Sequence, residues 1–556
     1  MRKTIIILSC CTVALLAGYS SYRGYQVWKQ SHWMSMAKSF AAKSDGRNEL
    51  LCLQQVLRTN PRDLEACRMM ANLTEATRSS SALIWRQRVL ELNPKSADDR
   101  LALAQTALVF KDYAAATNAL AGLSEADKKT FAYHNIAGVI AMAEGHIDAA
   151  EAHFSEAARL EPGNPVPQVN LSVVRLHGTN LLDRAEARID LKRIMLNSTN
   201  AAMRSKAERE LIIDAMRLKD THTALQLSKD LAQQTNSIFS DRLLRLEVLK
   251  EAKSAEFRPA LVLYQHEAAN DPAKLYEMAN WQIERISPSD ALAWLQSLPV
   301  NVQTNQPAAL LAAECQILTQ DWNGLRNSLQ KQNWAELEFT RHAFLARALR
   351  GLDLASASQA EWEVALIEAD RQKSTMIALF RLAAQWNWET EGENILWTIV
   401  NRYPEEQWAS QILGQALYDS GQTRSLMQLY SQESKRTPSD LSLKNNLAMT
   451  ALLLNEQDMK PYELAKDVYQ KSPTNSDYIS TYAFSLYLQG KNAEALKVIE
   501  KIKPQVLKYP SIAGYYGIIL KATGNRAQAR SYLDVALKAH LLPEERKLFT
   551  QAKAGI

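Results

Sequence analysis

Residues 512–541 read IAGYYGIILKATGNRAQARSYLDVALKAHL, and residues 478–508 read YISTYAFSLYLQGKNAEALKVIEKIKPQVLK. The two stretches repeat one another at a shift of 34 residues. The matched positions are Tyr482-Ala483 with Tyr516-Gly517, Leu486 with Leu520, Gly490 with Gly524, Ala495 with Ala529, and Ile499 with Leu533. Each stretch has two apolar stripes at helical spacing, separated by a turn that contains glycine. Each stretch therefore predicts a pair of antiparallel α-helices.

Small residues recur where the two helices of a pair must approach each other. They are Ala483 and Ala495 in one stretch, and Gly517 and Ala529 in the other. A larger side chain at these positions would push the helices apart, because close helix packing fits ridges of side chains into grooves. We expect these four residues to lie at helix–helix contacts.

The same pattern extends upstream and keeps its phase. Its strongest single occurrence consists of Ala137-Gly138, Gly145, Ala150, Phe154, Ala157 and Pro162, and a later one consists of Leu413-Gly414, Gly421, Tyr430 and Pro438. Units begin near 97, 131, 165, 305, 339, 373, 407, 441, 476 and 510. This order of small and large residues resembles the tetratricopeptide repeat (TPR). The resemblance implies an all-α fold: a right-handed TPR-type superhelical solenoid of about 14–15 helical hairpins.

The phase divides the chain into segments. We expect an N-terminal TPR array over 30–200, irregular TPR-like hairpins over 201–304, a C-terminal TPR array over 305–541 and a capping helix over 542–556. In the irregular part the apolar pattern persists but the 34-residue phase is lost. The alternative is a break between two halves of the solenoid, near 180–200 or near 299–307.

Composition argues against several classes of protein. The net charge is +5 over 556 residues, and no Lys/Arg block occurs, so nucleic acid is not an expected partner. The five cysteines form no CxxC motif, so we expect no metal site. Cys52 and Cys67 would lie on consecutive helices; they could form a disulfide or remain free and buried.

The N-terminus has the features of a membrane anchor. The segment 1–3 is short and basic, and the segment 4–22 that follows it (TIIILSCCTVALLAGYSSY) carries no charge. As a helix this segment would measure ~28 Å, close to a bilayer core of ~30 Å. We expect a transmembrane signal-anchor helix in the cytoplasmic membrane, with the repeats on the extracytoplasmic side. The alternatives are a cleaved signal peptide, giving a secreted or periplasmic protein, and a lipidated Cys10.

No motif for catalysis is present. GxSxG, the P-loop, HExxH and GxGxxG are all absent, and the nine histidines are dispersed. We expect His146 and His153 to be exposed polar residues. The sequence therefore predicts no catalytic residues, no metal and no cofactor. The alternative is an enzyme with its site hidden in the irregular region.

Tryptophan is concentrated in one part of the chain, since nine of the twelve lie between Trp281 and Trp408. Most are expected to fill space between helices, as Trp362 would. Trp386, Trp388 and Trp408 instead fall at predicted helix ends or on the face that lines the inner groove of TPR proteins.

The resemblance also implies which residues line that groove, namely the second, fifth, ninth and twelfth of each first helix. Read in this way, the candidate residues are Arg347, Arg350, Arg381, Trp408, Gln411, Gln415, Tyr418, Asn445, Phe484 and Tyr487. A cationic and aromatic strip could bind an acidic or extended peptide, or a sugar chain stacked on the rings. The alternative is solvated arginines and ordinary packing.

These expectations favour a non-enzymatic protein. A shallow, elongated surface of repeated helices suits a peptide or a helix better than a reaction that needs a closed pocket. We expect a membrane-tethered TPR scaffold that binds a protein partner outside the cytoplasm, in cell-envelope assembly. The alternative is a TPR component of a polysaccharide synthesis or export machine with a glycan-contacting Trp-rich half.

Overall fold

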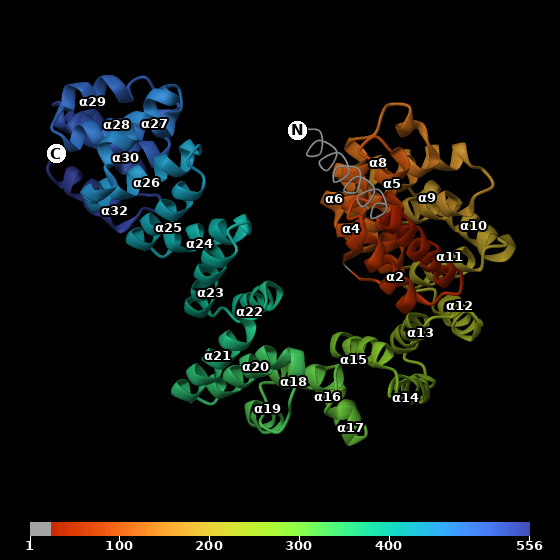
Figure 1. The fold of residues 1–556 in the computed structure, drawn as a ribbon. Helices are drawn as coiled ribbons and strands as arrows, with labels where there is room; N and C mark the ends of the chain where they lie inside the picture. Colours follow the sequence, from red (N-terminus) through yellow and green to blue (C-terminus); the bar gives the residue numbers. More distant parts are fainter. Residues whose placement is uncertain (1–23, 80) are drawn as a thin grey trace, which may run out of the picture. The chain divides into compact units, whose positions relative to one another are not determined.

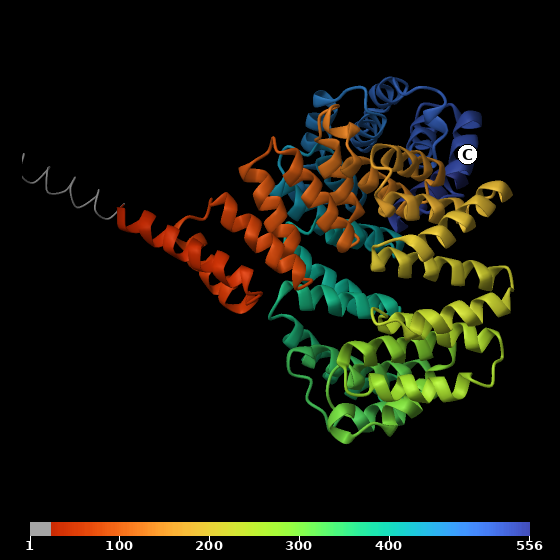
Figure 2. The same ribbon diagram turned by 90° about the vertical axis from the view of Figure 1, so that its right-hand side faces the viewer.

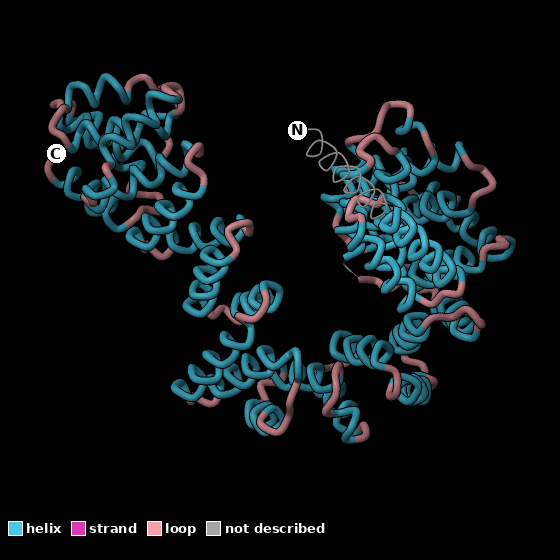
Figure 3. The backbone as a smooth tube through the Cα atoms, viewed as in Figure 1, coloured by secondary structure: helices cyan, strands magenta, loops and turns pink. Residues whose placement is uncertain are grey.

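The computed structural model describes residues 24–79 and 81–556. This part of the chain consists of helices joined by short turns and contains no strand (Figure 3). The predicted all-α class is therefore confirmed. Contacts divide the chain into two compact units, one up to Arg285 and one from Ile286 onward.

The first unit begins, in its described part, with a helix over residues 24–42. The following elements of this unit are α2 (Gly46–Thr59), α3 (Leu64–Ala76), α4 (Ser81–Leu92), α5 (Ala97–Val109), α6 (Tyr113–Ala121), η1 (Asp127–Lys129), α7 (Phe131–Ala143), α8 (Ile147–Leu160), α9 (Pro165–His177), α10 (Leu181–Asn197), α11 (Ala201–Arg217), α12 (Thr221–Gln233), α13 (Phe239–Glu251), α14 (Phe257–Ala268) and α15 (Pro272–Arg285).

The second unit continues the series. Its elements are α16 (Pro288–Ser297), α17 (Val300–Gln303), α18 (Ala308–Leu318), α19 (Trp322–Leu329), η2 (Ala335–Leu337), α20 (Glu338–Gly351), α21 (Ala355–Ala369), α22 (Lys373–Gln385), α23 (Glu389–Arg402), α24 (Gln407–Asp419), α25 (Thr423–Arg436), α26 (Leu441–Leu454), η3 (Gln457–Met459), α27 (Pro461–Lys471), α28 (Ser476–Leu488), α29 (Asn492–Ile499), η4 (Val506–Lys508), α30 (Pro510–Ala522), α31 (Arg526–Ala536) and α32 (Pro543–Ala554).

Within each unit, successive helices pack as hairpins, and the hairpins stack side by side (Figures 1 and 2). The pair α7 and α8 shows why the sequence folds this way. The ring of Phe154 lies against Gly138, where an added Cβ would come within 2.6 Å of it. Ala150 and Ala157 are fully buried on the same side of α8. The predicted helical hairpin is thus confirmed in the strongest repeat.

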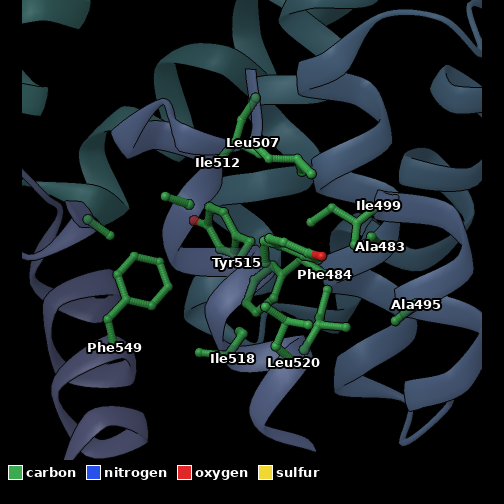
Figure 4. Packing of buried hydrophobic residues seen from close by; sticks show 14 of the residues in the cluster. Ala483, Phe484, Ala495, Ile499, Leu507, Ile512, Tyr515, Ile518, Leu520 and Phe549 are labelled. Carbon is green, nitrogen blue, oxygen red and sulfur yellow. The ribbon is translucent and has the colours of Figure 1, made fainter. Parts of the chain in front are cut away.

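The C-terminal repeats pack through the predicted small residues (Figure 4). Ala483, Ala495 and Ala529 are fully buried, and a Cβ on Gly517 would lie 2.8 Å from Leu533. In the other quoted repeat, Leu413 is fully buried, Gly414 and Tyr430 are half-buried, and Pro438 is exposed in the turn after α25. Small residues therefore set the spacing between helices, as the sequence predicts.

The turn inside many hairpins contains one residue in the left-handed region. It is glycine at Gly145, Gly421, Gly490 and Gly524. Other hairpins place a non-glycine residue there, at Lys111, Lys219, Lys253, Gln320, Asp353, Asn387 and Asn455. Glycine is the least strained choice for such a backbone, but its absence does not prevent the turn. Glycine spacing alone therefore underestimates the number of repeats.

The region without a clear phase also forms hairpins. Both α10 and α11 are 17 residues long, which displaces the repeat from its 34-residue spacing. Each helix from α9 to α13 nevertheless packs against the next. The contacts divide the chain between Arg285 and Ile286, whereas the alternative break was expected near 180–200 or 299–307.

Buried aspartates tie successive hairpins of the first unit together. Asp241 on α13 accepts hydrogen bonds from Arg209 on α11, and Asp214 on α11 accepts from Arg188 on α10. Burial alone would raise the pKa of Asp214, but hydrogen bonds and attraction from Arg188 and Arg217 hold that pKa below its usual value. The Asp214 carboxylate is therefore charged at neutral pH, and both aspartates join helices from different repeats.

Two expectations concern residues at or near the N-terminus. The predicted membrane span, 4–22, lies outside the described residues, and no described helix is both long and apolar enough to cross a bilayer. Cys52 and Cys67 are free and buried. Burial raises the pKa of both thiols, as it does for cysteines that serve as small apolar residues.

The last helix packs on two parts of the second unit. α32 packs against α30 and α31. The ring of Phe549 on α32 contacts that of Tyr515 on α30, with the ring centres 5.2 Å apart. The segment before it also reaches α24: Tyr418 Oη donates to the carbonyl of His540 at 3.1 Å, and the two rings lie 5.1 Å apart. Glu544 accepts a hydrogen bond from Thr423 on α25. The C-terminus thus contacts helices more than 100 residues upstream, a return that the sequence did not predict.

Candidate functional site

The predicted arginine strip is largely covered by its own chain. The guanidinium of Arg347 lies over the rings of Trp322, Trp386 and Trp388, at 5.5, 5.8 and 5.8 Å from their centres. Burial, followed by repulsion from Arg350, lowers the pKa of Arg347. Three indole rings of the same chain therefore surround this cation.

Arg350 is also engaged within the chain. Its guanidinium lies 3.5 Å from the centre of the Trp388 ring and forms an ion pair with Glu391 on α23. Arg381, on α22, is exposed. Of the three arginines, only Arg381 keeps the solvent-facing position that was predicted for the whole strip.

Of the three tryptophans expected at the groove, Trp388 is a core residue, and Trp386 and Trp408 are half-buried. Trp388 is only 5% exposed, and its ring packs edge-on against those of Trp362 and Trp386. The prediction that Trp388 does not fill space between helices is wrong, because the turn before α23 places its ring against Trp362 on α21. Trp408 is half-buried: its ring lies 5.7 Å from Phe380, and its Nε1 donates to Glu406 at 2.7 Å.

Phe484 is a core residue too. It is 1% exposed and packs against Tyr515, with the ring centres 4.8 Å apart, so it is not a surface contact for a partner. Its neighbour Tyr487 is half-buried and stacks beside it. The ninth position of α28 therefore points into the packed cluster rather than into an open groove.

Three of the predicted residues do come together at a cavity. Gln411, Gln415 and Tyr418, all on α24, line a cavity of about 450 Å³ between α24, α25 and the start of α26. Tyr430 and Leu429 of α25 form its apolar wall. This is the part of the predicted groove that the fold assembles.

A second cavity continues from the first. It measures about 430 Å³ and shares Tyr418 and Tyr430 with its neighbour. Helices α26, α28, α30 and α32 complete its lining, which includes Asn445, Tyr478, Ser480, Thr481, Tyr515 and Glu545. We refer to the two cavities together as the tyrosine groove.

Two polar atoms in the tyrosine groove lack a hydrogen-bond partner. They are Oδ1 of Asn445, on a residue that is 6% exposed, and Oγ of Ser480, on a residue that is 2% exposed. A buried polar group without a partner costs about 1–3 kcal/mol. Both atoms therefore gain a partner if a ligand with complementary groups occupies the cavity.

The sequence partly predicts this groove. Gln411, Asn445 and Ser480 occupy the fifth position of α24, α26 and α28, so the repeat phase could have identified Ser480 as well. Tyr430 was expected only as a packing residue. Glu545 was missed because it belongs to the returning C-terminal helix, and no repeat phase places that helix beside α26.

Other clusters of titratable residues are small. His153, predicted to be exposed, is half-buried on α8, and its Nδ1 lies 3.0 Å from Nδ1 of His134 on α7. Burial lowers the pKa of both imidazoles. No group of three or more His, Cys, Asp or Glu that could hold a metal occurs among the described residues.

Comparisons with known proteins add little beyond the fold. No protein-family model matches the chain, and no curated protein is similar to it in sequence. Among solved structures, one titled as a functional characterization of Pseudomonas aeruginosa pilF has 14% identity and a TM-score of 0.31, and covers 41% of this chain and 99% of its own.

Two larger assemblies also resemble the chain. The structure of Naa15/Naa10 bound to HypK-THB has 12% identity and a TM-score of 0.26, and covers 95% of this chain and 78% of its own. The APC/C hetero-tetramer Cut9–Hcn1 has 12% identity and a TM-score of 0.26, and covers 91% and 96%. At these values the similarities identify no partner, so function has to be argued from the residues of the groove.

Proposed function

We propose that this protein is a non-enzymatic TPR-type scaffold that binds a protein partner as an extended segment along the tyrosine groove. The observation that supports this most directly is the pair of unpartnered polar atoms, on Asn445 and Ser480, in a cavity bordered by six helices. The exposed amides of Gln411 and Gln415 continue this polar row on α24. Such a row suits the regularly spaced amides of a peptide backbone.

We also propose that residues 4–22 tether the scaffold to the cytoplasmic membrane, with the repeats on the extracytoplasmic side and a role in cell-envelope assembly. Support comes from the uncharged length of this segment and from the basic residues before it. Extraction of membranes at alkaline pH tests the tether: a signal-anchor stays in the pellet, whereas a secreted product of signal cleavage is released.

Binding of glycan by the Trp-rich half is a less favourable alternative. Trp334, Trp362 and Trp388 are buried in the helical core, and stacking on a sugar needs an exposed ring. Trp408 is the one tryptophan of the predicted strip, and it is half-buried. Quenching of Trp fluorescence by oligosaccharides but not by peptides would favour this alternative.

The double substitution Gln411→Ala/Gln415→Ala tests the groove. Loss of two hydrogen-bonding side chains is expected to weaken binding by roughly 5- to 150-fold, from about 0.5–1.5 kcal/mol for each bond. The measurement is quantitative affinity capture with the full-length, membrane-solubilised protein, followed by titration of each captured protein after purification.

Gln428→Ala is the matched control, because Gln428 is exposed on α25 but lines neither cavity. Its captured proteins and affinities are expected to equal those of the wild type. If the double variant also captures and binds its partners with wild-type affinity, the tyrosine groove is not the binding surface.

A further inference from the structure

The tyrosine groove is acidic. Glu433 and Asp440 line its first cavity, and Asp477 and Glu545 line its second. None of the described residues that line either cavity is Lys, Arg or His. Only Glu433 among these acids forms an ion pair, with Arg436 at 2.7 Å. The other three carboxylates form no ion pair within the described part of the chain.

The second cavity also offers acceptors and aromatic rings without a matching cation. Asn445 Oδ1 accepts no hydrogen bond, and the rings of Tyr478 and Tyr515 lie in the wall. A cation over an aromatic face is stabilised by about 0.5–1 kcal/mol at an exposed site and by about 2 kcal/mol when it is desolvated. An ammonium or guanidinium group carries only donors, so it complements a wall that is rich in acceptors.

Glu545 is held in a fixed position at the end of this cavity. It accepts hydrogen bonds from Tyr515 Oη at 2.5 Å and from the backbone N–H of Leu542 at 3.0 Å. Burial raises the pKa of this carboxyl group. A cation beside it would favour its charged form and would offset the cost of burying that charge.

We propose that the tyrosine groove selects a basic segment, and that a Lys or Arg side chain of this segment enters the cavity between α26, α28 and α32. This rests on the proposed function of the groove as a peptide-binding surface. It also reverses the charge expected from the sequence. Arg347 and Arg350 are covered by tryptophans and by Glu391, whereas three of the four groove acids form no ion pair among the described residues.

Selection from a phage-displayed library of random dodecapeptides on the purified full-length chain tests this inference. Peptides that bind are expected to be enriched in Lys or Arg at one fixed position. A synthetic peptide of the selected sequence is then titrated against Asp477→Asn and Glu545→Gln, and each change is expected to weaken binding by about tenfold or more. Asp467→Asn is the control, since Asp467 lies on α27, is half-exposed and lines neither cavity.

The outcomes separate the two proposals. The double variant Gln411→Ala/Gln415→Ala is expected to bind none of the selected peptides if the groove is the binding surface. If those peptides are enriched in Asp or Glu, or show no charge preference, the proposal of a basic segment is wrong but the groove remains the binding surface. If the wild type and that double variant select the same peptides equally well, the tyrosine groove is not the binding surface. Thermal unfolding of Glu545→Gln, measured in parallel, distinguishes lost binding from a displaced α32.

A second surface is argued independently, from α10 in the first unit. Leu182, Ile189 and Leu196 are 75%, 66% and 73% exposed, and they follow one another at intervals of seven residues. This spacing places them along one face of the helix, and Ala185, also exposed, lies between them. Three large apolar side chains on one face are unusual for a surface without a partner.

The charges on this face are arranged symmetrically about Ile189. In an antiparallel pair of α10 helices that cross at Ile189, Leu182 lies opposite Leu196 of the second copy, and Glu186 lies opposite Lys192 of the second copy. Both charged residues are exposed and form no ion pair among the described residues. We infer that this face packs against the same face of a second copy, as a two-fold interface requires.

Sedimentation velocity of the full-length chain in detergent tests this interface. The wild type is expected to form a concentration-dependent dimer, and Ile189→Asp is expected to stay monomeric. Glu186→Lys and Lys192→Glu are each expected to weaken self-association at least about fivefold, because like charges then face one another. Mixing these two variants pairs opposite charges and is expected to restore the dimer; failure to do so, or a monomeric wild type, overturns the inference.

Discussion

Phe549→Ala is expected to destabilise the C-terminal repeats by about 3–5 kcal/mol, the range for removal of a fully buried phenylalanine. The ring is 1% exposed, meets Tyr515 edge-on and covers Gly514 on α30. Its loss leaves a cavity between α30 and α32. The measurement is urea unfolding combined with hydrogen exchange of the α30 amides, which report directly on the covered helix.

Lys547→Ala is the matched control for this prediction. Lys547 is exposed on the same helix, so its truncation is expected to change stability by less than about 0.5 kcal/mol. If Phe549→Ala changes the exchange of α30 no more than this control does, α32 is not held by the contact described above.

Trp388→Ala is the second large effect, and it separates the structure from the sequence-based prediction for this residue. Because Trp388 packs against Trp362 and Trp386 beneath Arg350, its truncation is expected to cost about 3–5 kcal/mol. A ring on an open groove would be nearly neutral for stability instead, within about 0.5 kcal/mol. Urea unfolding followed by circular dichroism measures the difference.

Trp408→Ala provides the comparison, since this ring is only half-buried and lies against Phe380 on one side. Its expected cost is smaller, about 1–2 kcal/mol, in proportion to the smaller apolar area removed from water. Equal costs for the two variants would contradict the different burial of the two tryptophans.

The hairpins could be predicted from the sequence because their determinants are local. Gly138 and Phe154, or Gly517 and Leu533, meet within a single repeat, so spacing along the chain is enough to pair them. Between residues 180 and 304 the 34-residue spacing could not be followed along the sequence. The reason is that α10 and α11 are long and that the turns at Lys219 and Lys253 contain no glycine.

The residues that line the tyrosine groove were predicted less well, because burial depends on neighbours from other repeats. Helical position identified Gln411, Gln415 and Tyr418, which do line the groove. The same rule selected Arg347 and Phe484, but it could not show that Trp386 and Tyr515 cover them. The acidic character of the groove depends in part on Glu545, which only the returning C-terminus brings there.

The contacts of the C-terminal segment with α24 and α25 change how this end of the chain can unfold. An open stack of repeats frays from its last member, because each hairpin touches only the one before it. Here the bonds from Tyr418 to the carbonyl of His540 and from Thr423 to Glu544 fasten the tail to helices four hairpins upstream. The stretch from α24 to α32 is therefore joined at its two ends by these hydrogen bonds. Unfolding cannot begin at the C-terminus until the bonds break, and the hairpins between α24 and α32 then unfold together.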